Sequence, residues 1–197
     1  ACQPKTTVVV SPGALQPIPK RWLINFVAKH VKKRVPAWRL LNASSFESVL
    51  SEGHRASFAP PELLPEDVAI LQYTGGTTGD PRGAMLTHRN VVANILQVED
   101  IANPVLRDVM PNPLTMLTAL PLYHVFAMTV CALYALHAGM RVVLVINPRD
   151  LPALIDLWKK ESPHVFPAVN TLFAALVRQS AFRQVDFSRL RIALGGG

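Results

Sequence analysis

The sequence has 197 residues, of which 50% are hydrophobic and only 17% are charged, against about 25% charged residues in ordinary globular chains. Its formal net charge of +7 is concentrated in residues 1–55, which hold nine Lys and Arg against two Asp and Glu, whereas residues 56–197 hold eleven of each. This distribution argues against a nucleic-acid-binding surface across the whole chain and confines any basic surface to one segment.

The composition and the two ends of the chain favour a piece of a longer polypeptide. An excess of apolar side chains is typical of a segment that packs against more protein, and the chain begins at Ala1 and stops at RIALGGG, where a strand would pass into a loop. Cys2 and Cys131 show neither metal-ligand spacing nor a disulfide framework, which is typical of a reducing compartment. We therefore expect a cytoplasmic protein, with a basic segment over residues 1–55 and an α/β core over residues 56–197.

The basic segment is expected to contain a strand end at residues 8–10 and an amphipathic helix over residues 20–34, before Pro36. Trp22 and Phe26 share one half of this helix, and Lys and Arg side chains share the other. A helix with these two halves either docks on the core or lies at a membrane surface. Both alternatives stay open, and the second predicts a peripheral contact with the inner face of the cytoplasmic membrane.

Strands and helices alternate through the rest of the chain. The predicted strands cover residues 67–74, 117–124, 140–146, 164–169 and 190–194. The predicted helices begin at the N-cap Thr87 and end at about Gln97, and cover residues 125–137, 150–160 and 170–179. Continuous apolar strands with short connections predict an α/β fold with a largely parallel β-sheet flanked by helices.

The longest apolar tract, residues 115–138, also needs to be tested as a membrane span. Pro121, His124 and His137 interrupt it, and such groups are costly in a lipid-facing helix. The tract is therefore predicted as a buried strand followed by a buried helix.

A loop rich in glycine and threonine follows the first strand of the core, within LQYTGGTTGDPRGAMLTHRN at residues 71–90. Glycine lets backbone N–H groups turn around an anion, threonine hydroxyls add donors, and Arg82 adds a positive charge. In α/β sheets, ligands gather where strands end. The loop therefore predicts a phosphate-binding cradle, although the Gly-Lys-Ser/Thr run of the usual P-loop is missing.

The run YTGGTTGDPRG, followed by AMLTHRN, closely resembles the phosphate-binding signature of the adenylate-forming enzymes: acyl-CoA synthetases, luciferases and the adenylation domains of peptide synthetases. The resemblance extends to LPLYHVFAMT and to the closing LGGG. Gly75, PLYHVFA and NPRDLPALI are most similar to the bacterial long-chain fatty acid–CoA ligases. One departure is Arg82, where the family usually has a lysine. The positive charge is kept, but it is spread over the planar, forked guanidinium group.

The resemblance implies ATP-dependent activation of a fatty acid to an acyl-adenylate and then to acyl-CoA, with release of pyrophosphate and AMP. ATP, Mg²⁺ and coenzyme A are the implied cofactors and co-substrates. The family's later segments, including the Thr-Glu run and the C-terminal domain with its lysine, are absent from this sequence, so we expect residues 1–197 to be inactive alone. Two alternatives stay open: a non-catalytic nucleotide-binding or assembly module, and an adenylate-forming enzyme for another carboxylic acid. The oligomeric state is also open, with a homodimer as one option.

The resemblance also assigns roles to individual residues. His124 is the candidate catalytic residue, expected to position the acyl carboxylate rather than to transfer a proton. Phe126, Asn170 and Thr171 are expected at the acyl pocket, with core packing of Phe126 and helix capping by Asn170 as alternatives. No metal ligand is expected in this chain. The residues expected to bind the nucleotide are Tyr73, which could instead be a packed core residue, Thr74, Gly75, Gly76, Thr77, Thr78, Gly79, Arg82, Gly195, Gly196 and Gly197.

Overall fold

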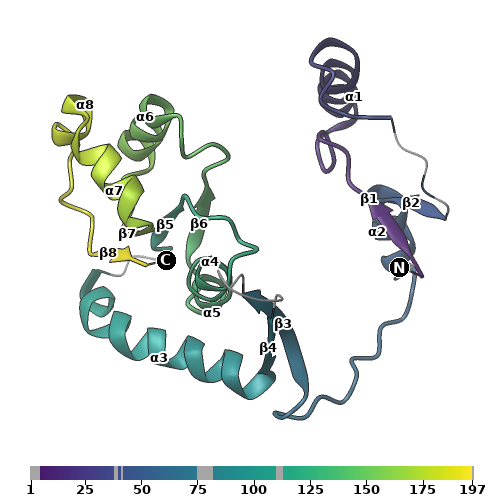
Figure 1. Cartoon of the computed structure of the whole chain (residues 1–197), viewed down its shortest axis with the longest axis horizontal. Coiled ribbons are helices and arrows are strands. Elements are labelled where there is room, and N and C mark those ends of the chain that lie inside the picture. The colour runs from purple at the N-terminus through teal and green to yellow at the C-terminus, as the bar shows by residue number, and fades with distance from the viewer. Residues whose placement is uncertain (1–4, 38–39, 41, 75–81, 110–112, 197) are drawn as a thin grey trace. The chain divides into compact units, whose positions relative to one another are not determined.

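The computed structural model describes residues 5–37, 40, 42–74, 82–109 and 113–196. The chain divides into two compact units, Ala1–Glu62 and Leu63–Gly197 (Figure 1). The division falls inside the proline-containing connector of residues 60–65, beyond the change in charge at residue 55.

The first unit contains a two-stranded parallel sheet and two helical segments. Strand β1 (Thr7–Val9) pairs with β2 (Ala43–Ser45). Helix α1 (Ile18–Phe26) continues as the π-helical segment η1 (Val27–Val31), and α2 is Phe46–Gly53. The predicted strand and amphipathic helix are therefore confirmed, with the helix beginning two residues earlier than expected and ending at Val31. The strand β2 and the helix α2 were not predicted.

The second unit begins with an antiparallel hairpin that the sequence did not predict. Strand β3 (Val68–Thr74) was expected, but β4 (Arg82–Thr87) pairs with it, with Thr74 opposite Arg82. The glycine-rich loop therefore connects two antiparallel strands and does not lead directly into a helix. Thr87 then caps the next helix, as predicted, and forms a reciprocal capping box with Asn90.

Helix α3 (His88–Leu106) is longer than the predicted helix, which ended at about Gln97. Val98, Ala102 and Leu106 recur at four-residue spacing and pack into the core of the unit. This continued apolar face keeps the chain helical despite Pro104. The short 3₁₀ segment η2 (Arg107–Val109) follows.

A four-stranded parallel sheet with the order β6-β5-β7-β8 forms the centre of the second unit, which confirms the predicted fold class. The strands are β5 (Thr115–Thr118), β6 (Arg141–Leu144), β7 (Val165–Ala168) and β8 (Ile192–Gly195). The connecting helical segments are α4 (Val125–Ala127), η3 (Met128–Tyr134), α5 (Ala135–His137), α6 (Leu151–Glu161), α7 (Asn170–Val177) and α8 (Ser180–Arg183). The prediction for residues 117–124 was wrong in its bounds, because the strand starts at Thr115 and ends before Pro121.

Helices cover both faces of this sheet. Met116 and Val165 point into a cluster with α3 and η3, whereas their neighbours Leu117 and Phe166 point into a second cluster with α6, α7 and α8. This alternation is the two-residue period of a strand. In the second cluster, Trp158 packs edge-on against Phe166, with ring centroids 4.6 Å apart.

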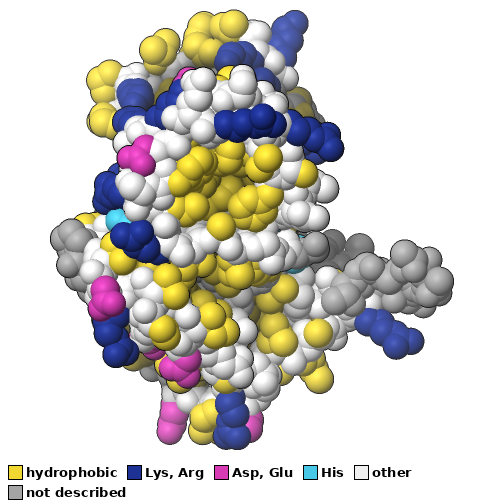
Figure 2. Space-filling model, turned by 90° about the vertical axis from the view of Figure 1, so that its left-hand side faces the viewer, with side chains coloured by type: hydrophobic (Ala, Val, Ile, Leu, Met, Phe, Trp, Pro, Cys, Tyr) yellow, Lys and Arg dark blue, Asp and Glu magenta, His cyan; other side chains and the backbone are white. Residues whose placement is uncertain are grey.

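The apolar tract around η3 lies in this core as a buried strand and a helix, as predicted. In the described part of the chain, no helix has both the length and the hydropathy needed to cross a membrane. Cys131 is fully buried on η3, and burial raises the pKa of its thiol to about 11. Hydrophobic side chains also reach the surface, where they gather in a hollowed patch on one face of the second unit (Figure 2).

Candidate functional site

The end of the hairpin holds the part of the glycine-rich loop that the structure describes. Tyr73 of β3 pairs with Gly83 of β4 across the hairpin. A Cβ added at Gly83 would lie 3.4 Å from the tyrosine ring. Glycine therefore lets the ring lie close to the facing strand. Tyr73 is 64% exposed, so it is not a core residue of this unit. The side chain of Thr74 and residues 75–81, which include Gly75, Gly76, Thr77, Thr78 and Gly79, lie outside the described part of the chain.

His124 is the N-cap residue of α4. Its Nδ1 accepts a hydrogen bond from the backbone N–H of Phe126 at 3.3 Å. A neutral imidazole that accepts at Nδ1 carries its hydrogen on Nε2. The capping bond therefore leaves Nε2–H as the donor of the ring, a group that can hydrogen-bond to a carboxylate.

Phe126 and the C-terminal glycines come together in space. A Cβ added at Gly196 would lie only 3.1 Å from Cζ of Phe126, so glycine allows the backbone to lie directly against the ring. The backbone N–H of Gly196 donates to the carbonyl of Ala168 at 3.2 Å, which holds the segment after β8 beside the end of β7. Gly195 ends β8. Gly197 lies outside the described residues.

Asn170 and Thr171 begin α7, immediately after β7, and both are exposed. The N-cap of this helix is Val169, without a side-chain cap, so the capping alternative for Asn170 is wrong. Because β5, β7 and β8 are parallel, Asn170, Gly196 and the segment leading to His124 all leave the sheet at its carboxyl edge. This edge is where α/β sheets bind ligands.

A pocket of about 720 Å³ lies between α3 and the sheet of the second unit. Its lining is mostly apolar and includes Val125 and Phe126, the two residues after His124, together with Met116 in the sheet. The α3 residues that line it include Asn90, Gln97 and Ile101. These α3 residues were not predicted to bind a ligand, because Asn90 also serves the capping box and only the folded chain shows which face of α3 is turned inward.

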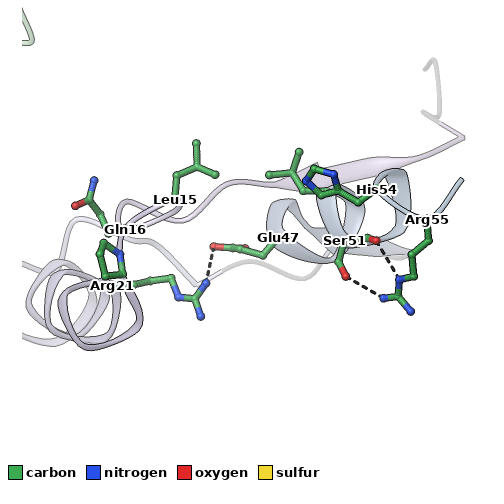
Figure 3. A pocket seen from close by; sticks show the side chains of 9 residues that line it. Leu15, Gln16, Arg21, Glu47, Ser51, His54 and Arg55 are labelled. Atoms are coloured by element: carbon green, nitrogen blue, oxygen red, sulfur yellow. Dashed lines mark hydrogen bonds and ion pairs between the residues drawn. The ribbon is translucent and has the colours of Figure 1, made fainter. Parts of the chain in front are cut away.

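A second, open groove of about 740 Å³ lies in the first unit (Figure 3). Its polar groups bind one another: Arg21 pairs with Glu47 at 4.0 Å, and Arg55 donates to Oγ of Ser51 at 2.9 Å. Leu15, Gln16 and His54 complete its labelled lining. Because its charges are internally paired, this groove is a weaker candidate than the pocket beside α3.

The described residues do not form a magnesium site by themselves. Within the described ranges, no three His, Cys, Asp or Glu side chains gather closely enough to hold a metal ion.

Residues 2–197 match the sequence model of a protein family that is described as "AMP-binding enzyme". The chain is 47% identical to a long-chain-fatty-acid–CoA ligase of Escherichia coli O157:H7 over 90% of this chain and 31% of the relative. A ligase of the same name from Haemophilus influenzae is also 47% identical, over 90% of this chain and 32% of the relative. The chain thus spans about a third of the length of these relatives.

Solved structures show the same fold. A fatty acyl-adenylate ligase from L. pneumophila, solved with acyl adenylate and pyrophosphate, superposes with a TM-score of 0.64 at 21% identity over 86% of this chain and 30% of that chain. The N-terminal domain of FACL13 from Mycobacterium tuberculosis superposes with a TM-score of 0.64 at 19% identity, over 96% of this chain and 44% of that chain. An o-succinylbenzoate coenzyme A synthetase from Bacillus subtilis, solved with ATP and a magnesium ion, superposes with a TM-score of 0.59 at 20% identity. The match covers 97% of this chain and 34% of that chain.

Proposed function

The chain belongs to the family of AMP-binding enzymes, and from this premise we propose that the full-length protein is a long-chain fatty acid–CoA ligase. It joins a fatty acid to ATP, releasing pyrophosphate, and then transfers the acyl group from the adenylate to coenzyme A, releasing AMP. The cofactor set in this proposal is ATP with Mg²⁺, and coenzyme A is the second substrate.

The pocket beside α3 is the observation that carries this proposal. It is mostly apolar, and its volume of about 720 Å³ lies within the usual range of 300–1,000 Å³ for small-molecule sites. Its α3 wall follows the glycine-rich hairpin directly, and its other wall begins next to His124. A fatty acid in this pocket would place its chain among apolar side chains, with its carboxylate near His124 and the phosphate-binding loop.

The roles of the loop residues follow from the chemistry of the first step. Joining a carboxylate to ATP brings two anions together, so donors and cations must be directed at the phosphates. We assign this role to Thr74, Arg82 and the backbone of residues 75–79, with Tyr73 at the end of the strand. His124 positions the carboxylate through Nε2–H. Phe126, Asn170, Thr171 and the glycines at 195–197 border the acyl chain and the adenine.

The test is pyrophosphate release by the full-length protein with ATP, magnesium and a series of acids from acetate to oleate. Release that increases with chain length supports the proposal. Release that is greatest with acetate or with an aromatic acid would assign another carboxylic acid as the substrate. A full-length protein that binds ATP but releases no pyrophosphate with any acid would instead be a non-catalytic nucleotide-binding module. In the same assay, residues 1–197 alone are expected to release none.

A second proposal concerns the partner of α1. Trp22 is 73% exposed, and Leu23 and Phe26 are also exposed. Lys29 of the continuing segment η1 and its C-cap residue Lys32 are exposed as well. Apolar side chains combined with lysines suit a helix that lies in the interface of an anionic membrane. Long-chain fatty acids partition into membranes, so this contact would hold the enzyme near its substrate.

Changing both Lys29 and Lys32 to glutamine is expected to weaken the binding of the full-length protein to phosphatidylglycerol vesicles by about 30-fold, since each basic residue near an anionic surface contributes about 1 kcal/mol. Vesicle co-sedimentation at fixed ionic strength measures the change. The matched control changes Arg149 and Arg178, two exposed arginines of the second unit, to glutamine. Equal losses in the two double variants would show a non-specific charge effect and rule out docking through α1.

A further inference from the structure

The amino-terminal edge of the four-stranded sheet carries a row of polar side chains, at the end opposite to the proposed active site. The register pairs Arg141 of β6 with Thr115 of β5. His164 and Arg191 immediately precede Val165 and Ile192, which pair with each other across β7 and β8. The fold therefore brings all four residues to the same edge of the sheet.

His164 is held in this row by hydrogen bonds to both neighbouring strands. Its backbone N–H donates to the carbonyl of Thr115 at 2.8 Å, and its own carbonyl accepts from the N–H groups of Arg191 and Ile192 at 2.8 and 3.1 Å. In its ring, Nδ1 accepts from the backbone N–H of Thr115 at 3.0 Å. The side chain is only 2% exposed, so neither the backbone nor the ring can easily rotate away.

These bonds decide the position of the imidazole hydrogen. A neutral imidazole has one N–H and one acceptor nitrogen. Because Nδ1 is the acceptor, Nε2 carries the hydrogen. The contact recorded for Nε2 among the described residues is Nη2 of Arg189, at 3.1 Å. A guanidinium has only donors, so two N–H donors face each other at hydrogen-bond distance.

The charges around this contact are positive. Burial lowers the pKa of His164, and Arg189 and Arg191 lower it further, which keeps the ring neutral. Glu161 of α6 pairs with Arg141, and Asp186, three residues before Arg189 in the sequence, accepts from the backbone N–H of Ser188 at 2.8 Å. The buried Nε2–H of His164 and the guanidinium of the exposed Arg189 therefore converge in a positive field, at a point where an acceptor is required.

We propose that His164 and Arg189 form a binding site for a phosphate-type oxyanion at the amino-terminal edge of the sheet. One oxygen of the anion accepts from Nε2–H of His164, and another accepts from the guanidinium of Arg189. Both bonds are charge-assisted, and they replace the contact between two donors. The site is separate from the glycine-rich loop, and the inference does not rest on the proposed function.

Phosphate binding by the full-length protein tests this site. Isothermal titration calorimetry with inorganic phosphate at constant ionic strength is performed in an Arg82→Ala background, so that the glycine-rich loop contributes little. Arg189→Gln is expected to weaken phosphate binding at least about tenfold, since it removes a charge-assisted bond. Arg189→Lys keeps the charge and is expected to retain affinity within about threefold. Arg178→Gln, which changes an exposed arginine at the end of α7, is the control and is expected to leave binding unchanged.

A second arm identifies the source of the phosphate group. Vesicles of phosphatidylglycerol are sedimented with the same variants. Binding that is lost in Arg189→Gln and is displaced by inorganic phosphate would assign the site to a lipid headgroup, whereas phosphate binding without vesicle binding would assign it to a soluble phosphate compound. Equal phosphate affinity in Arg189→Gln and Arg178→Gln, with no difference in vesicle binding, would overturn the proposal and leave water as the acceptor.

Discussion

Replacing Arg82 by alanine in the full-length protein is expected to lower the rate of pyrophosphate release by about 10²- to 10³-fold, the range found when one directed donor is removed from an active site. Arg82 begins β4 directly opposite Thr74, the last residue of β3. Its backbone is therefore fixed at the base of the glycine-rich loop by the hairpin pairing. Without its charge, the repulsion between the acyl carboxylate and ATP would be offset less well as they react.

Arg82→Lys and Arg89→Ala make this prediction specific. Lysine keeps the charge but loses the two-pronged donor, so Arg82→Lys is expected to retain most of the activity that alanine removes. Arg89 lies in the first turn of α3, where its exposed guanidinium pairs with Glu66. Surface pairs contribute little, and Arg89→Ala is expected to release pyrophosphate at the wild-type rate. An Arg82→Ala enzyme within threefold of the wild type would remove Arg82 from the phosphate site.

Local sequence patterns predicted the elements whose signals are contained in a few residues. Thr87 caps α3 through its side chain, as expected, and Asp150, the first residue of the helix predicted over residues 150–160, caps α6. The apolar runs around Leu117 and Phe166 became central strands. Strand β4 was missed because its residues, RGAMLT, pair only through the register with β3 and look like a continuation of the loop. The end of α3 was missed because its last two turns are stabilised by core contacts of Ala102 and Leu106, which no local pattern shows.

The candidate site, too, could be predicted from the sequence only in part. The resemblance singled out His124 and Phe126, and the structure places both at the start of α4, with Phe126 in the lining of the pocket. It did not identify Gln97 or Ile101, because a pocket wall is defined by the face of α3 that the sheet covers. Nor could the sequence show that Thr115, more than forty residues away, fixes the tautomer of His164. Such contacts depend on strand order and register.

Filling the pocket beside α3 should change chain-length preference more than it changes activity itself. Gln97 lines the pocket from an exposed position on α3, so Gln97→Trp can place an indole in the pocket without overpacking the buried core. If the ring excludes about three methylenes of a long acyl chain, the loss is about 2.4 kcal/mol at 0.8 kcal/mol for each methylene, or about 50-fold. We expect kcat/KM for palmitate to fall by this factor and kcat/KM for butyrate to change less than twofold.

Val92→Trp provides the matched control for this prediction. Val92 lies on the same helix and is 53% exposed, but it is not part of the pocket lining. A tryptophan there adds the same bulk without entering the pocket, so both acids should be activated as in the wild type. If Gln97→Trp slowed palmitate and butyrate equally, the indole would be disturbing the helix that follows the phosphate loop. If it slowed neither acid, the acyl chain would bind elsewhere, and the pocket would no longer support the proposed function. A selective loss for palmitate, absent in Val92→Trp, therefore requires the chain to lie along the inner face of α3.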